Sequence, residues 1–144
     1  MNKNVLLNTK ISLFKATNEN SVVDNVTIGF MIDRFKSGYY KDEIEQVRKE
    51  DKATGDSITK RNLPTVAFHG LFDTFRKKDR FYEASGLIIL DIDDVEDDLE
   101  EVKKDIMDSD DSVFAAMISP SGTGIKVLYY VQPDLVNSDN YRQI

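Results

Sequence analysis

The chain has 144 residues, of which 40% are hydrophobic and 31% charged, and its formal net charge at pH 7 is −7. This length suits one domain with a hydrophobic core, and no apolar run approaches the roughly 18 residues that a membrane helix requires. The absence of cysteine excludes disulfides and thiolate metal sites, and residues 1–4 lack the apolar core of a signal peptide. We therefore expect a single cytoplasmic domain over residues 1–144, with no membrane partner.

Charged residues are unevenly distributed along the chain. Acidic side chains crowd residues 91–111, whereas basic side chains are prominent between residues 52 and 80. The negative total argues against a nonspecific grip on a nucleic-acid backbone, which needs clustered lysine and arginine. Lys60, Arg61 and Arg76 in the basic region are nevertheless candidate contacts for nucleic acid or a triphosphate. The alternative is that they belong to a solvated charged surface.

The N-terminal half of the sequence predicts a strand followed by two helices. Partial alternation of apolar and polar residues indicates a strand over residues 4–14, and the polar residues 18–24 indicate a loop. Apolar residues then recur at helical spacing over residues 26–36, until a Ser-Gly pair stops the pattern. A second helix is expected over residues 40–50, and the polar residues 51–62 are expected to form a loop.

The middle of the chain predicts a short apolar strand over residues 65–68, then a loop with a short helical turn over residues 72–85. His69, the only histidine in the chain, ends that strand. It is a candidate substrate contact, but a lone histidine is also common as a hydrogen-bonded structural residue.

The C-terminal third predicts a helix and two strands. Asp97, followed three residues later by a glutamate, resembles a capping box at the start of an amphipathic helix. Strands are expected over residues 113–118 and 125–131, with a turn between them. Asn137 or Ser138 is a candidate cap for a last helix. The whole pattern predicts an α+β domain, and we expect it to be the N-terminal piece of a longer protein.

Residues 86–94 contain four large apolar residues that lead into an acidic cluster. Such a run predicts a buried strand, and residues two apart in a strand share a face, so Asp91 and Asp93 are expected on the same side. Two adjacent carboxylates repel each other unless a cation lies between them, and Mg²⁺ or Mn²⁺ with oxygen ligands meets that need. The pair therefore indicates a metal site for phosphoryl or nucleotidyl transfer. The alternative is a strand end whose acids cap the next helix.

A serine- and glycine-rich turn followed by a lysine forms the second candidate site. It is longer than the two-residue turn that a hairpin needs, and its glycines permit close backbone approach. Hydroxyl and amide groups in such a turn can form an anion-binding nest, next to which a lysine can meet a phosphate. The alternative is an ordinary long hairpin loop. The candidate phosphate-binding residues are Ser119, Ser121, Gly122, Thr123, Gly124 and Lys126.

In their order and spacing, these segments resemble the VirE N-terminal-type domain, found at the front of replication or mobilisation proteins of Bacteroidetes mobile elements. The resemblance rests on the helix pair, residues 60–64, the short strand, residues 85–93 and residues 119–126. That family is regarded as a divergent branch of the archaeo-eukaryotic primase (primase-polymerase) superfamily. The resemblance implies an α+β fold with a mixed or antiparallel sheet, an RRM-like β-α-β-β core and flanking N-terminal helices.

The resemblance also implies roles for the two candidate sites. The superfamily's first motif is an apolar strand that ends in a D-x-D or D-x-E metal pair, which Asp91 and Asp93 match. Its second motif is a serine-glycine turn leading to a histidine that contacts nucleotide phosphates. The Ser-Gly-x-Gly of residues 121–124 matches the turn, and Lys126 stands where histidine is expected. A third acidic residue has no candidate before Ile144, so we expect it beyond this chain or missing.

The resulting hypothesis is a divergent primase-like domain that binds Mg²⁺ or Mn²⁺ and the phosphates of a nucleotide or nucleic acid. Its expected partners are nucleotides, DNA or RNA, and C-terminal helicase-like or other replication domains of the same protein. If active, it would be a metal-dependent nucleotidyltransferase.

Two other functions fit parts of the sequence. The first is a catalytically inactive module that binds nucleic acid or protein within a larger replication factor, which the replaced histidine and the missing third acid favour. The second is a phosphatase of the haloacid-dehalogenase type, which also begins with an apolar strand and D-x-D. Those enzymes continue with a Gly-Thr-type turn, where this chain has residues 94–96, Asp-Val-Glu.

Overall fold

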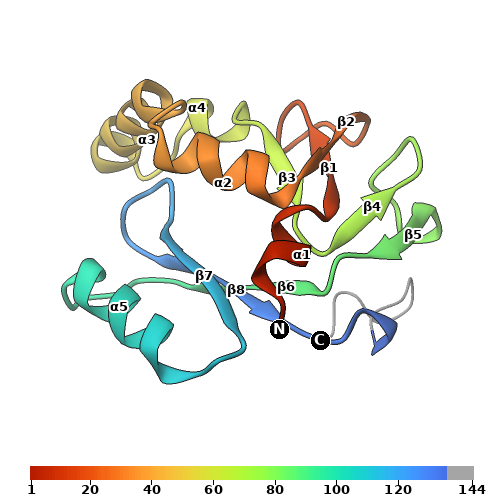
Figure 1. Cartoon of the computed structure of the whole chain (residues 1–144). Coiled ribbons are helices and arrows are strands. Elements are labelled where there is room, and N and C mark those ends of the chain that lie inside the picture. Colours follow the sequence, from red (N-terminus) through yellow and green to blue (C-terminus); the bar gives the residue numbers. More distant parts are fainter. Residues whose placement is uncertain (136–144) are drawn as a thin grey trace.

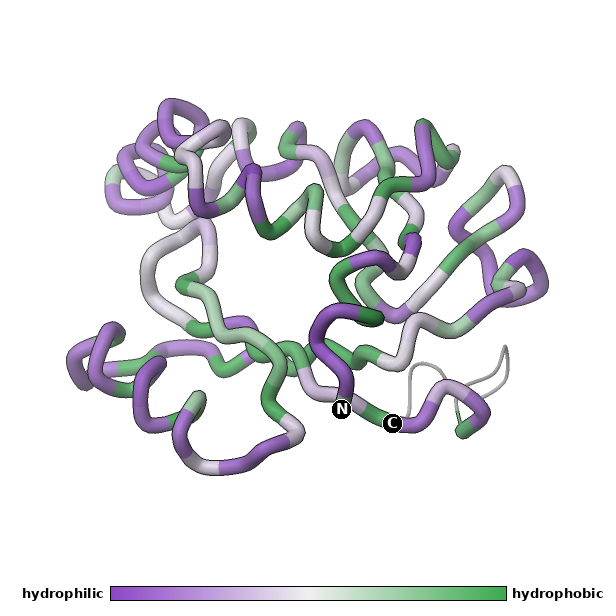
Figure 2. Tube along the Cα trace, viewed as in Figure 1, coloured by the Kyte–Doolittle hydropathy of each residue, from purple (hydrophilic) through white to green (hydrophobic). Residues whose placement is uncertain are grey.

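Two three-stranded antiparallel sheets contribute to one hydrophobic core in the computed structural model, which describes residues 1–135 (Figure 1). The core cluster takes Ile11 and Ile28 from the N-terminal layer and Leu87, Phe114 and Leu128 from the C-terminal layer. Hydrophilic residues dominate the long helix at the outer edge of the N-terminal layer (Figure 2). The α+β class predicted from the sequence is confirmed.

The N-terminal layer is a sheet of order β2-β1-β3 covered by helices. Its strands are β1 (Lys10–Phe14), β2 (Val22–Thr27) and β3 (Thr65–Ala67). Its helices are α1 (Lys3–Leu7), α2 (Ile28–Lys36), α3 (Lys41–Thr54) and α4 (Ile58–Arg61). A separate hairpin of β4 (Gly70–Phe72) and β5 (Phe81–Ala84), with the 3-10 turn η1 (Lys78–Arg80), follows β3.

The C-terminal layer has a β-α-β-β order. It contains β6 (Leu87–Ile92), α5 (Leu99–Ser109), β7 (Val113–Ile118), β8 (Ile125–Tyr130) and the 3-10 turn η2 (Pro133–Leu135). Because β8 pairs antiparallel with both β6 and β7, those two strands run parallel with β8 inserted between them. This is a split β-α-β arrangement, in which α5 forms the crossover.

Most predicted elements are confirmed, and the errors occur where side-chain caps or tertiary pairing override the local pattern. The predicted strand over residues 4–14 is wrong in its first half, because the Asn2 side chain accepts hydrogen bonds from two backbone amides and caps α1. The loop predicted over residues 51–62 is wrong, because α3 continues to Thr54 and α4 follows. In residues 18–24, a loop was expected, but β2 already begins at Val22.

Two further corrections concern the middle of the chain and the cap of α5. Residues 72–85 include strand β5, which pairs with β4 and leaves only η1 as the expected helical turn. The cap of α5 is Asp98, whose carboxylate accepts the amide of Glu101 at 3.0 Å, so Asp97 is not the cap. The predicted cap at Asn137 or Ser138 lies outside the described residues.

Strand β6 is not the buried strand that its apolar run predicted. Leu87 is fully buried, but 45% of Leu90 and 40% of Ile92 are exposed. The reason is position: β6 is an edge strand of its sheet, and α5 packs on β7. An apolar run therefore identified the strand correctly but overstated its burial.

Among residues 1–135, no helix has the length and apolar character needed to span a bilayer.

Leu128 and Leu90 provide a direct test of this architecture. Replacing the fully buried Leu128 with alanine is expected to lower the free energy of unfolding by about 2–5 kcal/mol, because it leaves a cavity in the core. The matched change Leu90→Ala on the exposed edge is expected to cost about 1 kcal/mol or less. Urea unfolding of both variants measures the difference, and equal losses would contradict an exposed β6.

Candidate active site

The register of β6 and β8 places Asp91 directly opposite Lys126. The Lys126 ammonium nitrogen Nζ lies 2.6 Å from Asp91 Oδ1, so the lysine forms a short ion pair with the carboxylate. Alternation along the strands puts Asp91 on the same face as Leu87, and Lys126 on the same face as Leu128. Both leucines belong to the core between the layers. The ion pair therefore lies on the sheet face that is directed at the N-terminal layer.

Asp93 is the first residue after β6, so strand pairing fixes the side of Asp91 but not that of Asp93. The next residue, Asp94, has a φ of +53°, a left-handed conformation that aspartate tolerates better than most residues. The chain then meets the β7–β8 turn, where the Val95 amide donates to the Thr123 carbonyl at 2.9 Å. The acidic segment and the serine-glycine turn are thus in direct contact.

A chain of hydroxyl groups closes the turn between β7 and β8. Ser119 and Ser121 are joined by a hydroxyl–hydroxyl bond of 3.0 Å, and Ser121 and Thr123 by one of 3.1 Å. The Gly124 amide donates to Ser119 Oγ at 3.1 Å, and the Gly122 amide donates to the Ser119 carbonyl at 2.9 Å. The amides of these two glycines are therefore used inside the turn. Hydroxyl groups and the remaining amides are what the turn offers to an anion.

Two glycines in the turn are required by close contacts. A Cβ at Gly124 would lie 2.6 Å from the Ile92 carbonyl oxygen, so glycine allows the turn to approach the end of β6. Gly122 has a φ of +78°, which disfavours other residues, and a Cβ there would lie 2.9 Å from Arg48 Nε. The first contact joins the two predicted motifs, and the second joins the turn to α3.

Arg48 is a residue of this site that sequence reasoning missed. It lies on α3 and donates from Nε to the Pro120 carbonyl at 3.3 Å across 72 positions of sequence. Figure 1 shows the β7–β8 turn rising from the lower layer toward α3. No pattern in the sequence links an arginine on a polar helix to a distant turn, so only the tertiary structure brings them together.

Two of the residues predicted to contact nucleic acid, Arg61 and Arg76, form hydrogen bonds with other parts of the chain. Arg61 donates two hydrogen bonds to Asp56, at 2.8 and 2.9 Å, and thereby lowers the pKa of that carboxyl group. Lys60 lies beside Arg61 in α4. The Arg76 guanidinium donates to the Thr17 carbonyl at 2.8 Å. These contacts stabilise local structure, and a role in nucleic-acid binding stays a prediction.

His69 is packed among aromatic rings. Its ring centre lies 5.6 Å from those of both Phe72 and Phe81. A shallow depression nearby is lined by Val22, Asn25, Phe72, Asp73, Thr74 and Tyr82. It includes none of the predicted site residues, so we assign the candidate site to the two motifs instead.

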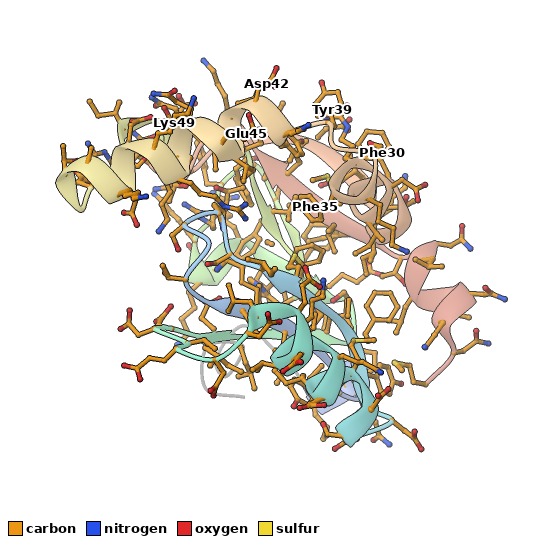
Figure 3. The ribbon with its side chains drawn as sticks, turned by 90° about the vertical axis from the view of Figure 1, so that its left-hand side faces the viewer. Phe30, Phe35, Tyr39, Asp42, Glu45 and Lys49 are labelled. Atoms are coloured by element: carbon orange, nitrogen blue, oxygen red, sulfur yellow. The ribbon has the colours of Figure 1, made fainter. Side chains whose placement is uncertain are left out.

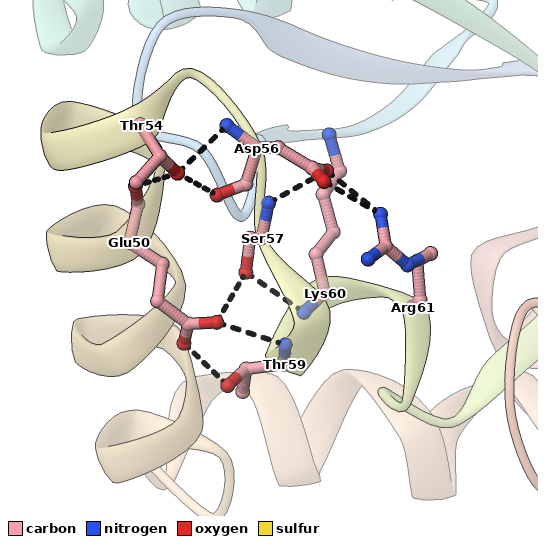
Figure 4. A network of polar contacts seen from close by, with 7 residues as sticks. All are labelled: Glu50, Thr54, Asp56, Ser57, Thr59, Lys60 and Arg61. Atoms are coloured by element: carbon pink, nitrogen blue, oxygen red, sulfur yellow. Dashed lines mark hydrogen bonds and ion pairs between the residues drawn. The ribbon is translucent and has the colours of Figure 1, made fainter.

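A polar network holds α3 against α4 and so supports the helix that carries Arg48 (Figure 4). The carboxylate of Glu50 accepts hydrogen bonds from the Thr59 hydroxyl at 2.5 Å and from the Thr59 amide at 3.1 Å. Ser57 caps α4 by accepting the Lys60 amide at 3.0 Å. The hydrogen bonds from Thr59 lower the pKa of Glu50 below its ordinary value of 4.5.

Exposed aromatic side chains from α2 and from the connection between α2 and α3 form a separate cluster. Phe30 and Tyr39 are 41% and 59% exposed, and the Arg34 guanidinium carbon lies 4.5 and 4.1 Å from their ring centres. Figure 3 shows Tyr39 near the start of α3, the helix that carries Asp42 and Glu45. Because the cation is already held by the rings and acidic residues follow, we assign no phosphate-binding role to this cluster.

The donor set of the site suits a hard divalent cation. Asp91 and Asp93 supply carboxylate oxygens, and Mg²⁺ typically takes one or two protein carboxylates together with water and substrate phosphates. Within residues 1–135, no three acidic, histidine or cysteine side chains are grouped so as to hold a metal by themselves. A metal would therefore depend on ligands from the substrate or from water.

Residues 58–142 match the family model described as BT4734-like, N-terminal domain. The match includes both motifs and leaves Arg48 outside. No curated protein and no solved structure matches the chain.

The hydrogen bonds to Glu50 predict a pH-dependent contribution to stability. Because its pKa is lowered on folding, this contribution is complete above pH 4.5 and is lost as pH falls through the lower folded-state value. Glu50→Gln is expected to lower the free energy of unfolding at neutral pH, with a difference from wild type that shrinks below pH 4.5. Urea unfolding over this pH range measures it. Glu45→Gln, on the exposed side of the same helix, is the control, and an equal effect there would contradict the assignment.

Proposed function

We propose that this chain, which belongs to the family of BT4734-like N-terminal domains, binds the phosphates of a nucleotide or nucleic acid, together with a divalent metal, where β6 meets the β7–β8 turn. The observation that carries the proposal is the contact between two motifs that are separated by helix α5 and strand β7 in sequence. Gly124 packs against Ile92, and Asp91 pairs with Lys126. The groups that we propose for phosphate binding and for metal binding are therefore adjacent.

Each group has a definite chemical role in this proposal. The Lys126 ammonium is a compact point charge for a phosphate oxygen, and the hydroxyls of Ser121 and Thr123 donate hydrogen bonds to neighbouring phosphate oxygens. Asp91 and Asp93 would hold Mg²⁺ or Mn²⁺. When bound, the metal would neutralise charge on the phosphates.

The proposal extends to the superfamily suggested by the sequence. The chain would be a VirE N-terminal-type, primase-polymerase-like domain that acts in the cytoplasm during replication or mobilisation of a mobile element. Nucleotidyl transfer would then depend on positioning and charge neutralisation, and C-terminal domains of the same protein would be its partners.

One observation favours a second function, a binding module without catalysis. Lys126 lies 2.6 Å from Asp91 and already neutralises that carboxylate, so Asp91 does not need a metal to balance its charge. In that case the turn and the lysine bind nucleic-acid or nucleotide phosphates, and Asp91 only orients the lysine. The two functions differ in whether bound metal increases nucleotide affinity.

A titration of Mn²⁺ and fluorescently labelled nucleoside triphosphate distinguishes these functions. We expect wild-type protein to bind the nucleotide more tightly with Mn²⁺, and we expect Asp91→Ala to lose the metal dependence. Lys126→Ala should weaken binding by about tenfold or more, since it removes a charged hydrogen bond. Asp105→Ala, an exposed acid on α5, is the matched control.

The dependence of nucleotide binding on metal separates the two functions. Binding that is independent of metal but lost in Lys126→Ala supports the binding module. Equal affinity in wild type, Asp91→Ala and Lys126→Ala would refute the site.

A further inference from the structure

The Arg48 guanidinium lies over the β7–β8 turn from the opposite layer of the molecule. Its Nε donates to the Pro120 carbonyl at 3.3 Å, and Gly122 lies directly beneath it, since a Cβ there would be 3.5 Å from Cζ. Because Gly122 has no side chain, the guanidinium can occupy this space. The contact fixes a positive charge above the same residues that carry the hydroxyl groups of the turn.

This positive charge is not neutralised by a neighbouring acid. Within residues 1–135, Arg48 forms no ion pair, and its one hydrogen bond uses Nε and leaves the two Nη groups available. Its side chain is exposed, so an anion in solution can reach those groups. A planar guanidinium with two free Nη groups is well suited to bidentate hydrogen bonds with phosphate.

We propose that Arg48 is a second phosphate-binding cation of the site, and that the ligand is the polyphosphate of a nucleotide rather than a single phosphate group. This inference rests on the proposed function and names its substrate class. Arg48 contacts the turn at Pro120, Ser121 and Thr123 supply its hydroxyl row, and Lys126 follows the turn in β8. Two cations from separate elements that adjoin one row of hydroxyl donors fit an anion with more than one phosphate group.

The spacing of the two cations supports this assignment. Gly122, beneath Arg48, and Lys126 are four residues apart, a distance of at most about 14 Å even for an extended chain. Both cations can therefore contact one polyphosphate. A polyphosphate offers each of the two cations a phosphate group of its own.

Arg48 also couples the two layers of the molecule through the ligand. It belongs to α3, whereas Lys126 belongs to β8. A polyphosphate that binds both side chains would join the layers, and this contact is in addition to the hydrogen bond at Pro120. The network around Glu50 holds α3 in the position that this requires.

The test compares nucleoside triphosphate and nucleoside monophosphate binding in three variants of α3. Arg48→Ala removes the charge, Arg48→Lys keeps the charge without the planar geometry, and Lys49→Ala removes the neighbouring exposed cation as a matched control (Figure 3). Labelled triphosphate is titrated directly, and the monophosphate is measured by competition. Thermal melting of each variant shows whether it is folded.

We expect Arg48→Ala to weaken triphosphate binding by about tenfold or more, because a charged hydrogen-bonding partner is lost. Monophosphate affinity should change much less, so the preference for triphosphate falls. Arg48→Lys should recover part of the affinity, and Lys49→Ala should bind as wild type does. A purely structural role for Arg48 would not change the preference between the two ligands.

The result that overturns this inference differs from the one that overturns the proposed function. If Lys126→Ala loses binding while Arg48→Ala and Lys49→Ala both bind triphosphate normally, Arg48 is not a ligand contact and the site itself stands. Equal losses for triphosphate and monophosphate in Arg48→Ala would also refute the inference. If wild-type protein binds neither ligand, with or without Mn²⁺, both proposals are wrong.

Discussion

The insertion of β8 between β6 and β7 is the constraint on which the candidate site depends. Backbone pairing fixes which residues of β6 and β8 face each other, and this register puts Asp91 opposite Lys126 and Ile92 opposite Ile125. It also brings the start of β8 against the end of β6, where only glycine at position 124 leaves room. A shift of one residue would turn Lys126 to the other face of the sheet. The chemistry of the site is therefore a consequence of strand register.

Positively charged side chains of the protein itself offset the negative charge around Asp91. An acidic segment in a chain of net charge −7 suggests a site that needs an external cation. The structure provides Lys126 for Asp91, and it places Arg48 over the neighbouring turn. One positive charge thus contacts the acidic strand, and a second, from the other layer, contacts the adjoining turn. The ligand that we propose, phosphate together with a metal, carries charges of both signs, as this region of the protein does.

Local sequence patterns correctly predicted the elements whose structure depends mainly on residues close together in the chain. Helix α2 follows from helical spacing of apolar residues and ends at a Ser-Gly pair, and α5 follows from its acidic cap region, although the cap is one residue later. The β4–β5 hairpin was missed because its pairing joins residues on both sides of a charged segment. Burial of β6 was overestimated because hydrophobicity does not reveal whether a strand lies at an edge.

The sequence by itself determined the α+β class, the acidic strand end and the serine-glycine turn, because each depends on residues that are close together in the chain. Tertiary structure alone decided that Lys126 pairs with Asp91, that Gly124 packs against Ile92 and that Arg48 reaches the turn. These contacts join residues that are far apart in sequence, and their geometry depends on strand order and on how the two layers pack. The physical reason is that spacing in a sequence records local periodicity, whereas strand register and layer contact depend on the whole fold.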